Sequence, residues 1–187
     1  MQNPKLFMLM LGCRPEGRNT EQHDMFFGIG EQVKDLVPAI KAFWPEAKGN
    51  IHVDGWREVT QVDGYRITVL PKEEASAESG IDKLFFLNLG GYKPGEFDEF
   101  HYKMLAVAQE QAGAVKQAKQ TAFYKHTGFK GATSHIDDKF GVDVDELHEV
   151  KDILTAEAKQ RYRLEIKANE SAQEDELHLG YFQLHKL

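Results

Sequence analysis

The chain has 187 residues, of which 41% are hydrophobic and 28% are charged, as is typical of a folded protein with its own core. Its formal net charge is −7 and no basic segment stands out, so we expect no binding to nucleic acid. No apolar run approaches the roughly 18 residues of a membrane span, so we expect no membrane binding. No signal peptide is recognisable, and a single cysteine excludes an internal disulfide. We therefore expect a cytoplasmic, bacterial protein.

Residues 6–11 are apolar at every position, which predicts a central strand covered on both faces. The segment 5–12 (KLFMLMLG) returns 78 residues later as 83–90 (KLFFLNLG). At this offset nine of the nineteen residues from position 5 to 23 are identical, where composition alone gives about one or two. The later identities pair Gly17 with Gly95, Glu21 with Glu99 and His23 with His101. We therefore expect two copies of one unit.

A glycine-containing loop at 12–17 follows the first strand, and the apolar spacing over 19–43 then predicts a helix that Pro38 kinks or restarts. Two short extended segments come next, at 50–59 and 65–70, joined by an Asp-Gly turn signal. The first unit therefore predicts a strand, a helix and two strands.

The second copy repeats this order. The strand at 84–89 leads through a loop at 90–95 into an alanine-rich helix expected over 98–118. Two extended segments follow, at 133–140 and 142–150. Alternating apolar residues in the last part of the chain predict a terminal hairpin of strands at 162–167 and 177–184 that covers one sheet edge.

These elements predict an α+β fold. We expect a first repeat at 1–72, a second at 83–152 and a C-terminal β-hairpin at 153–187 packed on both. Each repeat has the order β-α-β-β and is too small to bury its surface well alone. The expected solution is a pseudo-twofold pair that shares one core or sheet.

The sequence also resembles a known family. The segment 9–19 (LMLGCRPEGRN), the following Glu21, His23 and Asp24, and the segment 52–56 (HVDGW) resemble the bacterial family called domain of unknown function 1543. That family is described with one or two copies of its domain, which agrees with the repeat. The resemblance is good over about 5–70 and looser over 83–150, where Gly91 and Tyr92 replace Cys13 and Arg14, and Asp138-Lys139 replaces Gly55-Trp56. It implies no reaction.

The loop after the first strand is one candidate site. If it enters a helix, its N–H groups and the helix dipole face a bound anion, and arginine suits carboxylate or phosphate. The expected ligand-binding residues are Gly12, Arg14, Gly17, Arg18 and Trp56. The alternative interpretation is that the glycines serve turn geometry and the arginines are solvated or paired with glutamates.

A second candidate joins His23 to the pair His52 and Asp54, which share a face of an extended segment. Two histidines and a carboxylate can hold a divalent metal or act as an acid–base group. The second copy offers His101, His135 and Asp137 as the equivalent metal candidates. The alternative is a structural latch, in which the same side chains bond to neighbouring loops.

Cys13 is the remaining catalytic candidate. A thiol between a strand and a helix, beside Arg14, can have a lowered pKa and act as a nucleophile, although lone cysteines also serve as small buried hydrophobes.

Three functions follow from these patterns. The first hypothesis is a protein that binds a small anionic ligand or a partner. The alternatives are a metal- or acid–base-dependent enzyme that uses His23, His52 and Asp54, and a structural interaction protein such as a homodimer. The sequence does not decide whether the protein is an enzyme.

Overall fold

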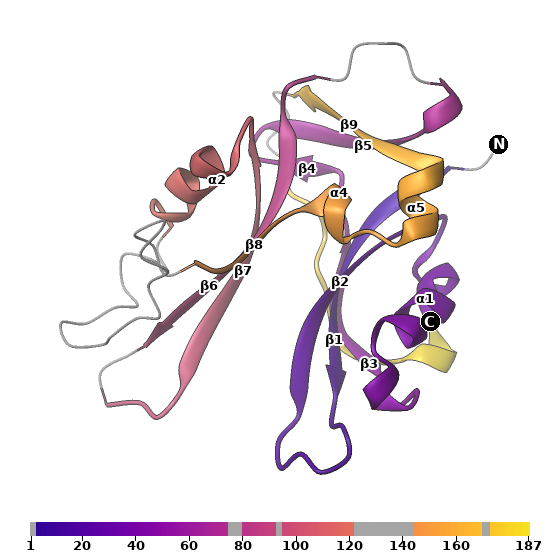
Figure 1. Cartoon of the computed structure of the whole chain (residues 1–187), viewed down its shortest axis with the longest axis vertical. Helices are drawn as coiled ribbons and strands as arrows, with labels where there is room; N and C mark the ends of the chain where they lie inside the picture. The colour runs from indigo at the N-terminus through magenta and orange to yellow at the C-terminus, as the bar shows by residue number, and fades with distance from the viewer. Residues whose placement is uncertain (1–2, 75–79, 93–94, 122–143, 170–172) are drawn as a thin grey trace. The chain divides into compact units, whose positions relative to one another are not determined.

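A computed structural model describes residues 3–74, 80–92, 95–121, 144–169 and 173–187 (Figure 1). The chain divides into two compact units, Met1–Ser79 with Ile153–Leu187, and Gly80–Asp152. The strands in the described ranges form three sheets whose pairings are antiparallel, so the α+β class expected from the sequence is confirmed. No helix in these described ranges is long and apolar enough to cross a membrane.

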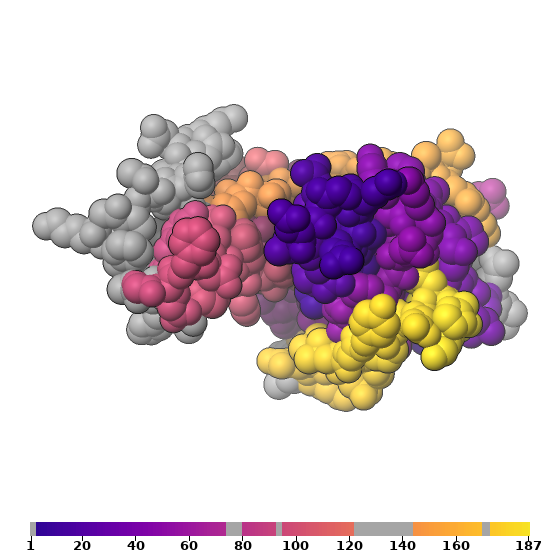
Figure 2. Space-filling model, turned by 90° about the horizontal axis from the view of Figure 1, so that it is seen from below, coloured from indigo at the N-terminus to yellow at the C-terminus, as the bar shows by residue number. Residues whose placement is uncertain are grey.

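The larger sheet of the first unit has four strands in the order β10-β3-β1-β2. Its members are β1 (Lys5–Cys13), β2 (Gln22–Gly30), β3 (His52–Glu58) and β10 (His178–Gln183). The apolar β1 is central, as its sequence predicts, because hydrogen-bonded neighbours flank it on both sides. The C-terminal segment, yellow in Figure 2, packs against the rest of this unit, where β10 pairs with β3.

The helix expected over 19–43 is wrong in its first half, because β2 forms there as the hairpin partner of β1. Residues 25–30 are nearly all apolar and include two glycines, so they fit a strand covered on both faces as well as a helix face. Glycine also weakens a helix interior. The helical part is limited to η1 (Val33–Leu36) and α1 (Val37–Phe43), with Pro38 in the first turn of α1, where its missing N–H costs nothing.

The helix α1 covers one face of this sheet. Its Ile40 is fully buried with Leu9 and Leu11 of β1 and Val53 of β3. A single turn, η2 (Pro45–Ala47), then leads into β3. Phe7, Leu9, Leu11 and Cys13 of β1 face this core, so Gly12 lies on the opposite face of the strand.

A second sheet of this unit has the order β4-β5-β9, from β4 (Gln61–Val62), β5 (Tyr65–Pro71) and β9 (Tyr162–Ala168). The expected turn joins β4 to β5, with Asp63 and Gly64 at φ values of 52° and 79°. The expected hairpin at 153–187 is wrong, since β9 pairs with β5 while β10 pairs with β3 in the other sheet. Short helical turns complete the unit: η3 (Lys72–Glu74), α5 (Ala156–Arg161) and η4 (Leu184–Lys186).

The second unit has a three-stranded sheet in the order β7-β6-β8, with β6 (Lys83–Tyr92), β7 (Glu99–Ala108) and β8 (Val144–Glu149). The helix expected over 98–118 is limited to α2 (Gln111–Ala118), because the residues before it form β7. The turn α4 (Val150–Ile153) follows β8. The strand expected at 133–140 lies outside the described residues.

Among the described residues, each unit therefore begins with two strands before its helix and a third strand after it, so the predicted β-α-β-β order, with a helix directly after the first strand, is wrong. In both units the first strand is central, the second is its hairpin partner and the third pairs on its other side. The pairing register also shifts at matching places, between Met10 and Leu11 in β1 and between Asn88 and Leu89 in β6.

The strand assignment of residues 22–30 can be tested at Gly28. A Cβ there would lie 2.9 Å from side-chain atoms of both Leu36 and Phe26. We expect Gly28→Ala to lower the free energy of unfolding by about 1–3 kcal/mol through overpacking. In a helix the same change would raise it by up to about 1 kcal/mol. Urea unfolding measures this change in the free energy of unfolding. If Gly28→Ala destabilises the Leu36→Ala protein less than it destabilises the wild type, the overlap with Leu36 is the cause.

Candidate functional site

A polar cluster lies on the face of the first sheet that α1 does not cover, around Gly12 of β1. In the strand register Gly12 is opposite His23 of β2 on one side and opposite His52 of β3 on the other. Directly opposed residues of neighbouring strands point to the same face. The two imidazoles therefore flank a position that carries no side chain.

A register shift in β3 adds a carboxylate to this cluster. Val53 is opposite Leu11 and Gly55 is opposite Met10, so Asp54 is the extra residue of a β-bulge. Its Oδ2 lies 3.2 Å from Nε2 of His23, and its Oδ1 lies 3.2 Å from Nε2 of His52. One carboxylate thus bridges two histidines that belong to different strands.

Glu21, just before β2, completes the cluster. Its Oε1 lies 3.1 Å from Nε2 of His52, and its Oε2 lies 3.7 Å from Nε2 of His23. Each of the two imidazole Nε2 atoms therefore lies within 3.7 Å of both carboxylates.

The cluster is buried on one side and open on the other. His52 is 6% exposed and the side chain of Asp54 is 21% exposed, whereas the side chains of His23 and Glu21 are 43% and 46% exposed. Within the described part of the chain, Nε2 of His52 and Oδ2 of Asp54 are buried and make no hydrogen bond of acceptable geometry. Leaving such atoms unsatisfied costs about 1–3 kcal/mol each, so they need another partner.

Gly12 is required for this arrangement. A Cβ at that position would overlap Nε2 of His52 and lie 2.5 Å from Oδ2 of Asp54. The missing side chain leaves the space into which the donor atoms point, and any larger residue would fill it.

The structure brings together His23, His52 and Asp54, which the sequence singles out, and adds Glu21. In the second unit it places His101 beside Glu99 and Asp145. The other two candidates of that copy, His135 and Asp137, lie outside the described residues. By strand register, the residue equivalent to Asp54 is Asp145, the bulge residue of β8, and not Asp137.

Sequence reasoning missed Glu21 and Glu99 because it placed both near helix starts, where residues i and i+2 do not share a face. In extended backbone, residues i and i+2 share a face, so each glutamate points to the same face as the histidine two positions later. The repeated Glu-x-His pattern at the 78-residue offset is the signal that could have found them.

The helix start on which the expected anion site was argued does not form. The loop after β1 enters the strand β2, so no helix N-terminus faces a ligand there. Arg14 and Arg18 are exposed in this hairpin loop, where Gly17 has a φ of 78°. Trp56 packs edge-on against Phe7 in the core, with ring centroids 6.1 Å apart, and so does not line the loop.

Cys13 follows Gly12 on β1 but faces the core, where it is 1% exposed. Burial raises the pKa of its thiol, and the negative charge of Glu21 adds to that rise. The thiol therefore stays protonated at neutral pH, and the lowered pKa expected from the sequence is not found. A protonated, buried thiol is a poor nucleophile.

The fold and the cluster together describe a protein of antiparallel sheets in which histidines and carboxylates meet beside a glycine of a central strand. Residues 18–69 match the family described as Domain of Unknown Function (DUF1543), as the resemblance of the sequence to this family predicts. The match includes the four residues whose side chains form the cluster.

The fold is similar to that of a solved structure, the crystal structure of a protein Il1583 from Idiomarina loihiensis. The similarity covers 97% of this chain and 99% of that chain with a TM-score of 0.62 and 24% sequence identity, so it extends to the fold alone. No curated protein matches the chain.

The state of Cys13 can be tested by its reactivity and by its effect on stability. We expect iodoacetamide to leave the folded protein essentially unmodified at pH 8 and to label it fully in urea. Because burial raises the pKa of the folded thiol above its ordinary value, ionisation of the thiol favours the unfolded state as the pH rises. The free energy of unfolding should therefore fall more steeply above about pH 8.5 in the wild type than in Cys13→Ala. Equal slopes or rapid labelling of the folded protein would contradict this assignment.

Proposed function

We propose that this protein binds a divalent transition metal in its first unit, through His23, His52, Asp54 and Glu21. The observation that carries the proposal is the buried Nε2 of His52, which lies within 3.2 Å of carboxylate oxygens from two segments and makes no hydrogen bond to described residues. A cation among these atoms would satisfy all of them at once.

The contacts between nitrogen and oxygen donors support a metal. Atoms that bind one ion at about 2.0–2.2 Å lie roughly 3–4 Å apart. The four nitrogen-to-oxygen distances in the cluster run from 3.1 to 3.7 Å. A structural latch would instead satisfy its buried donors with aligned hydrogen bonds, and it would not need Gly12 to lack a side chain.

The donor set favours a particular group of ions. Imidazole nitrogen suits Zn²⁺, Co²⁺, Ni²⁺ and Cu²⁺, whereas Ca²⁺ and Mg²⁺ prefer sites made only of oxygen. Two imidazoles with two carboxylates therefore favour Zn²⁺ and its neighbours. Calcium and magnesium are poor candidates for this cluster.

The exposed side of the cluster supports a second candidate function, a metal-dependent enzyme. A catalytic metal keeps a coordination position for water or substrate, and the half-exposed His23 and Glu21 leave that side open. A purely structural metal site is usually closed by protein ligands.

We also propose that the two units arose by duplication. Three features support this: the same order of strands, the register shift at matching residues, and a central-strand glycine opposite a histidine of the hairpin partner. The identical residues at the 78-residue offset agree with them.

Metal binding can be measured with untagged, full-length protein. We expect Zn²⁺ to bind by calorimetry, and Co²⁺ to give the visible absorption bands of a nitrogen- and oxygen-bound ion. His52→Gln should weaken metal binding at the first-unit cluster on the order of 100-fold, since it removes a ligand. His185→Gln, which changes an exposed histidine outside the cluster, should leave binding unchanged. Wild-type affinity weaker than about 100 μM, or equal affinities in both variants, would refute the proposal.

The role of Gly12 gives an independent test. We expect Gly12→Ala to abolish binding of Co²⁺ at the first-unit cluster, because its Cβ takes the space between His52 and Asp54. Circular dichroism should show that the sheet is kept, since alanine tolerates strand geometry. Normal Co²⁺ bands in a folded Gly12→Ala protein would show that the ion binds elsewhere.

A further inference from the structure

We propose that the second unit has a divalent-cation site of its own, formed by Glu99, His101 and Asp145. This proposal rests in part on the proposed function, because the likeness of the two clusters is one of its arguments. The geometry of the second cluster supports it separately.

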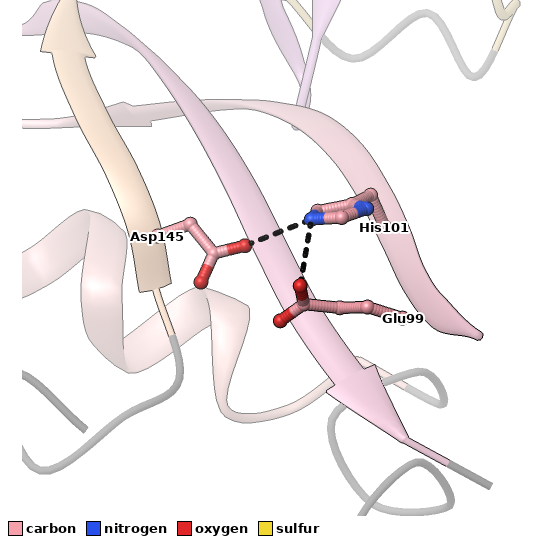
Figure 3. A group of neighbouring side chains, drawn as sticks. All are labelled: Glu99, His101 and Asp145. Atoms are coloured by element: carbon pink, nitrogen blue, oxygen red, sulfur yellow. Dashed lines mark ion pairs between the residues drawn. The ribbon is translucent and has the colours of Figure 1, made fainter. Parts of the chain in front are cut away.

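The three side chains come from the two strands that flank β6. Glu99 and His101 are alternate residues of β7 and so share a face, and Asp145 is the bulge residue of β8. Figure 3 shows them converging across the intervening strand, with Nε2 of His101 directed toward both carboxylates. Residues distant in sequence thus meet at one point of the sheet.

The distances suit a bound cation. Nε2 of His101 lies 3.3 Å from Oδ2 of Asp145 and 4.0 Å from Oε2 of Glu99, and one ligand atom from each residue lies within 4.8 Å of the other two. Donors around a single ion are separated by about 3–4 Å, so a small inward movement of Glu99 completes the set.

Gly90 supplies the same open space that Gly12 supplies in the first unit. It is opposite His101 in the strand register, and a Cβ there would overlap Oδ2 of Asp145 and lie 2.8 Å from its Oδ1. The carboxylate of Asp145 therefore reaches over the backbone of β6 only because position 90 lacks a side chain. A simple turn requirement does not explain this glycine, since it lies within a strand.

A further polar row lies next to the cluster on the same face. It holds Lys103, Asn88 and Glu146, in register across the three strands, and Glu146 accepts a hydrogen bond of 2.7 Å from Asn88. Among the described residues the cluster itself brings two carboxylates to one imidazole, a donor set that suits a cation.

The two clusters should differ in metal preference. The second holds one imidazole among the described residues, where the first holds two, and its two carboxylates are oxygen donors. Fewer nitrogen donors mean weaker binding of Zn²⁺ and a smaller preference for Zn²⁺ over Mn²⁺. We therefore assign the second site to a more weakly held, less discriminating divalent cation.

The test uses the full chain with His52→Gln, which weakens the first site on the order of 100-fold and leaves the residues of the second site unchanged. We expect calorimetry to show one equivalent of Mn²⁺ or Zn²⁺ bound, and we expect paramagnetic Mn²⁺ to broaden the amide signals of residues around Gly90. Adding His101→Gln should weaken this binding at least about tenfold. Adding His148→Gln instead is the matched control, because His148 is exposed on the same strand as Asp145.

The outcomes separate the two proposals. If His101→Gln leaves the remaining Mn²⁺ binding unchanged, or if no binding remains once His52 is replaced, the second site is wrong whatever the first site does. If Zn²⁺ binding depends on His101 but not on His52, the first site is wrong and the second is supported. Should His101→Gln unfold, Glu99→Gln removes a half-exposed ligand and is expected to weaken Mn²⁺ binding in the same way.

Discussion

A glycine in a central strand is the constraint on which the candidate site depends. Leu6, Met8 and Met10 share a face of β1 with Gly12, and their side chains stand between those of β2 and β3. At Gly12 that barrier is missing, and donors from both neighbours meet above the backbone. The bulge at Asp54 contributes the second half of the geometry, since the extra residue lets His52 and Asp54 reach the same point. Neither feature alone would bring two histidines and two carboxylates together.

The polar cluster is tolerable because the opposite face of the same strands is apolar. Leu9 and Leu11 are fully buried against Ile40 of α1. Burial of this kind contributes roughly 1.5–3 kcal/mol for each large side chain. The two unsatisfied atoms of His52 and Asp54 together cost about 2–6 kcal/mol, which is similar to what burial of two such side chains contributes. The core can therefore carry an unsatisfied cluster, and ligand binding would recover what that cluster costs.

Local patterns in the sequence predict the parts of the fold that depend on neighbours along the chain. The unbroken apolar run of β1, the Asp-Gly turn and the helix restart at Pro38 all follow from adjacent residues. The strand β2 was missed because nearly every residue over 25–30 is apolar, which removes the periodicity that separates strand from helix. The histidines and Asp54 were found by their spacing, but Glu21 depended on the strand assignment. The pairing of β9 with β5 depends on contacts across about 100 residues, which no local pattern contains.

The alternation of a strand also decides which donors are available to a metal. Cys13 follows Gly12 directly, and thiolate is a strong ligand for Zn²⁺. Because successive residues of a strand point to opposite faces, that single step moves the side chain from the cluster into the core, where burial raises the pKa of its thiol. The donors on the open face are therefore limited to nitrogen and oxygen. A catalytic metal needs a coordination position left open to water or substrate, and the exposed members of this sulfur-free set lie on the side where such a position would be.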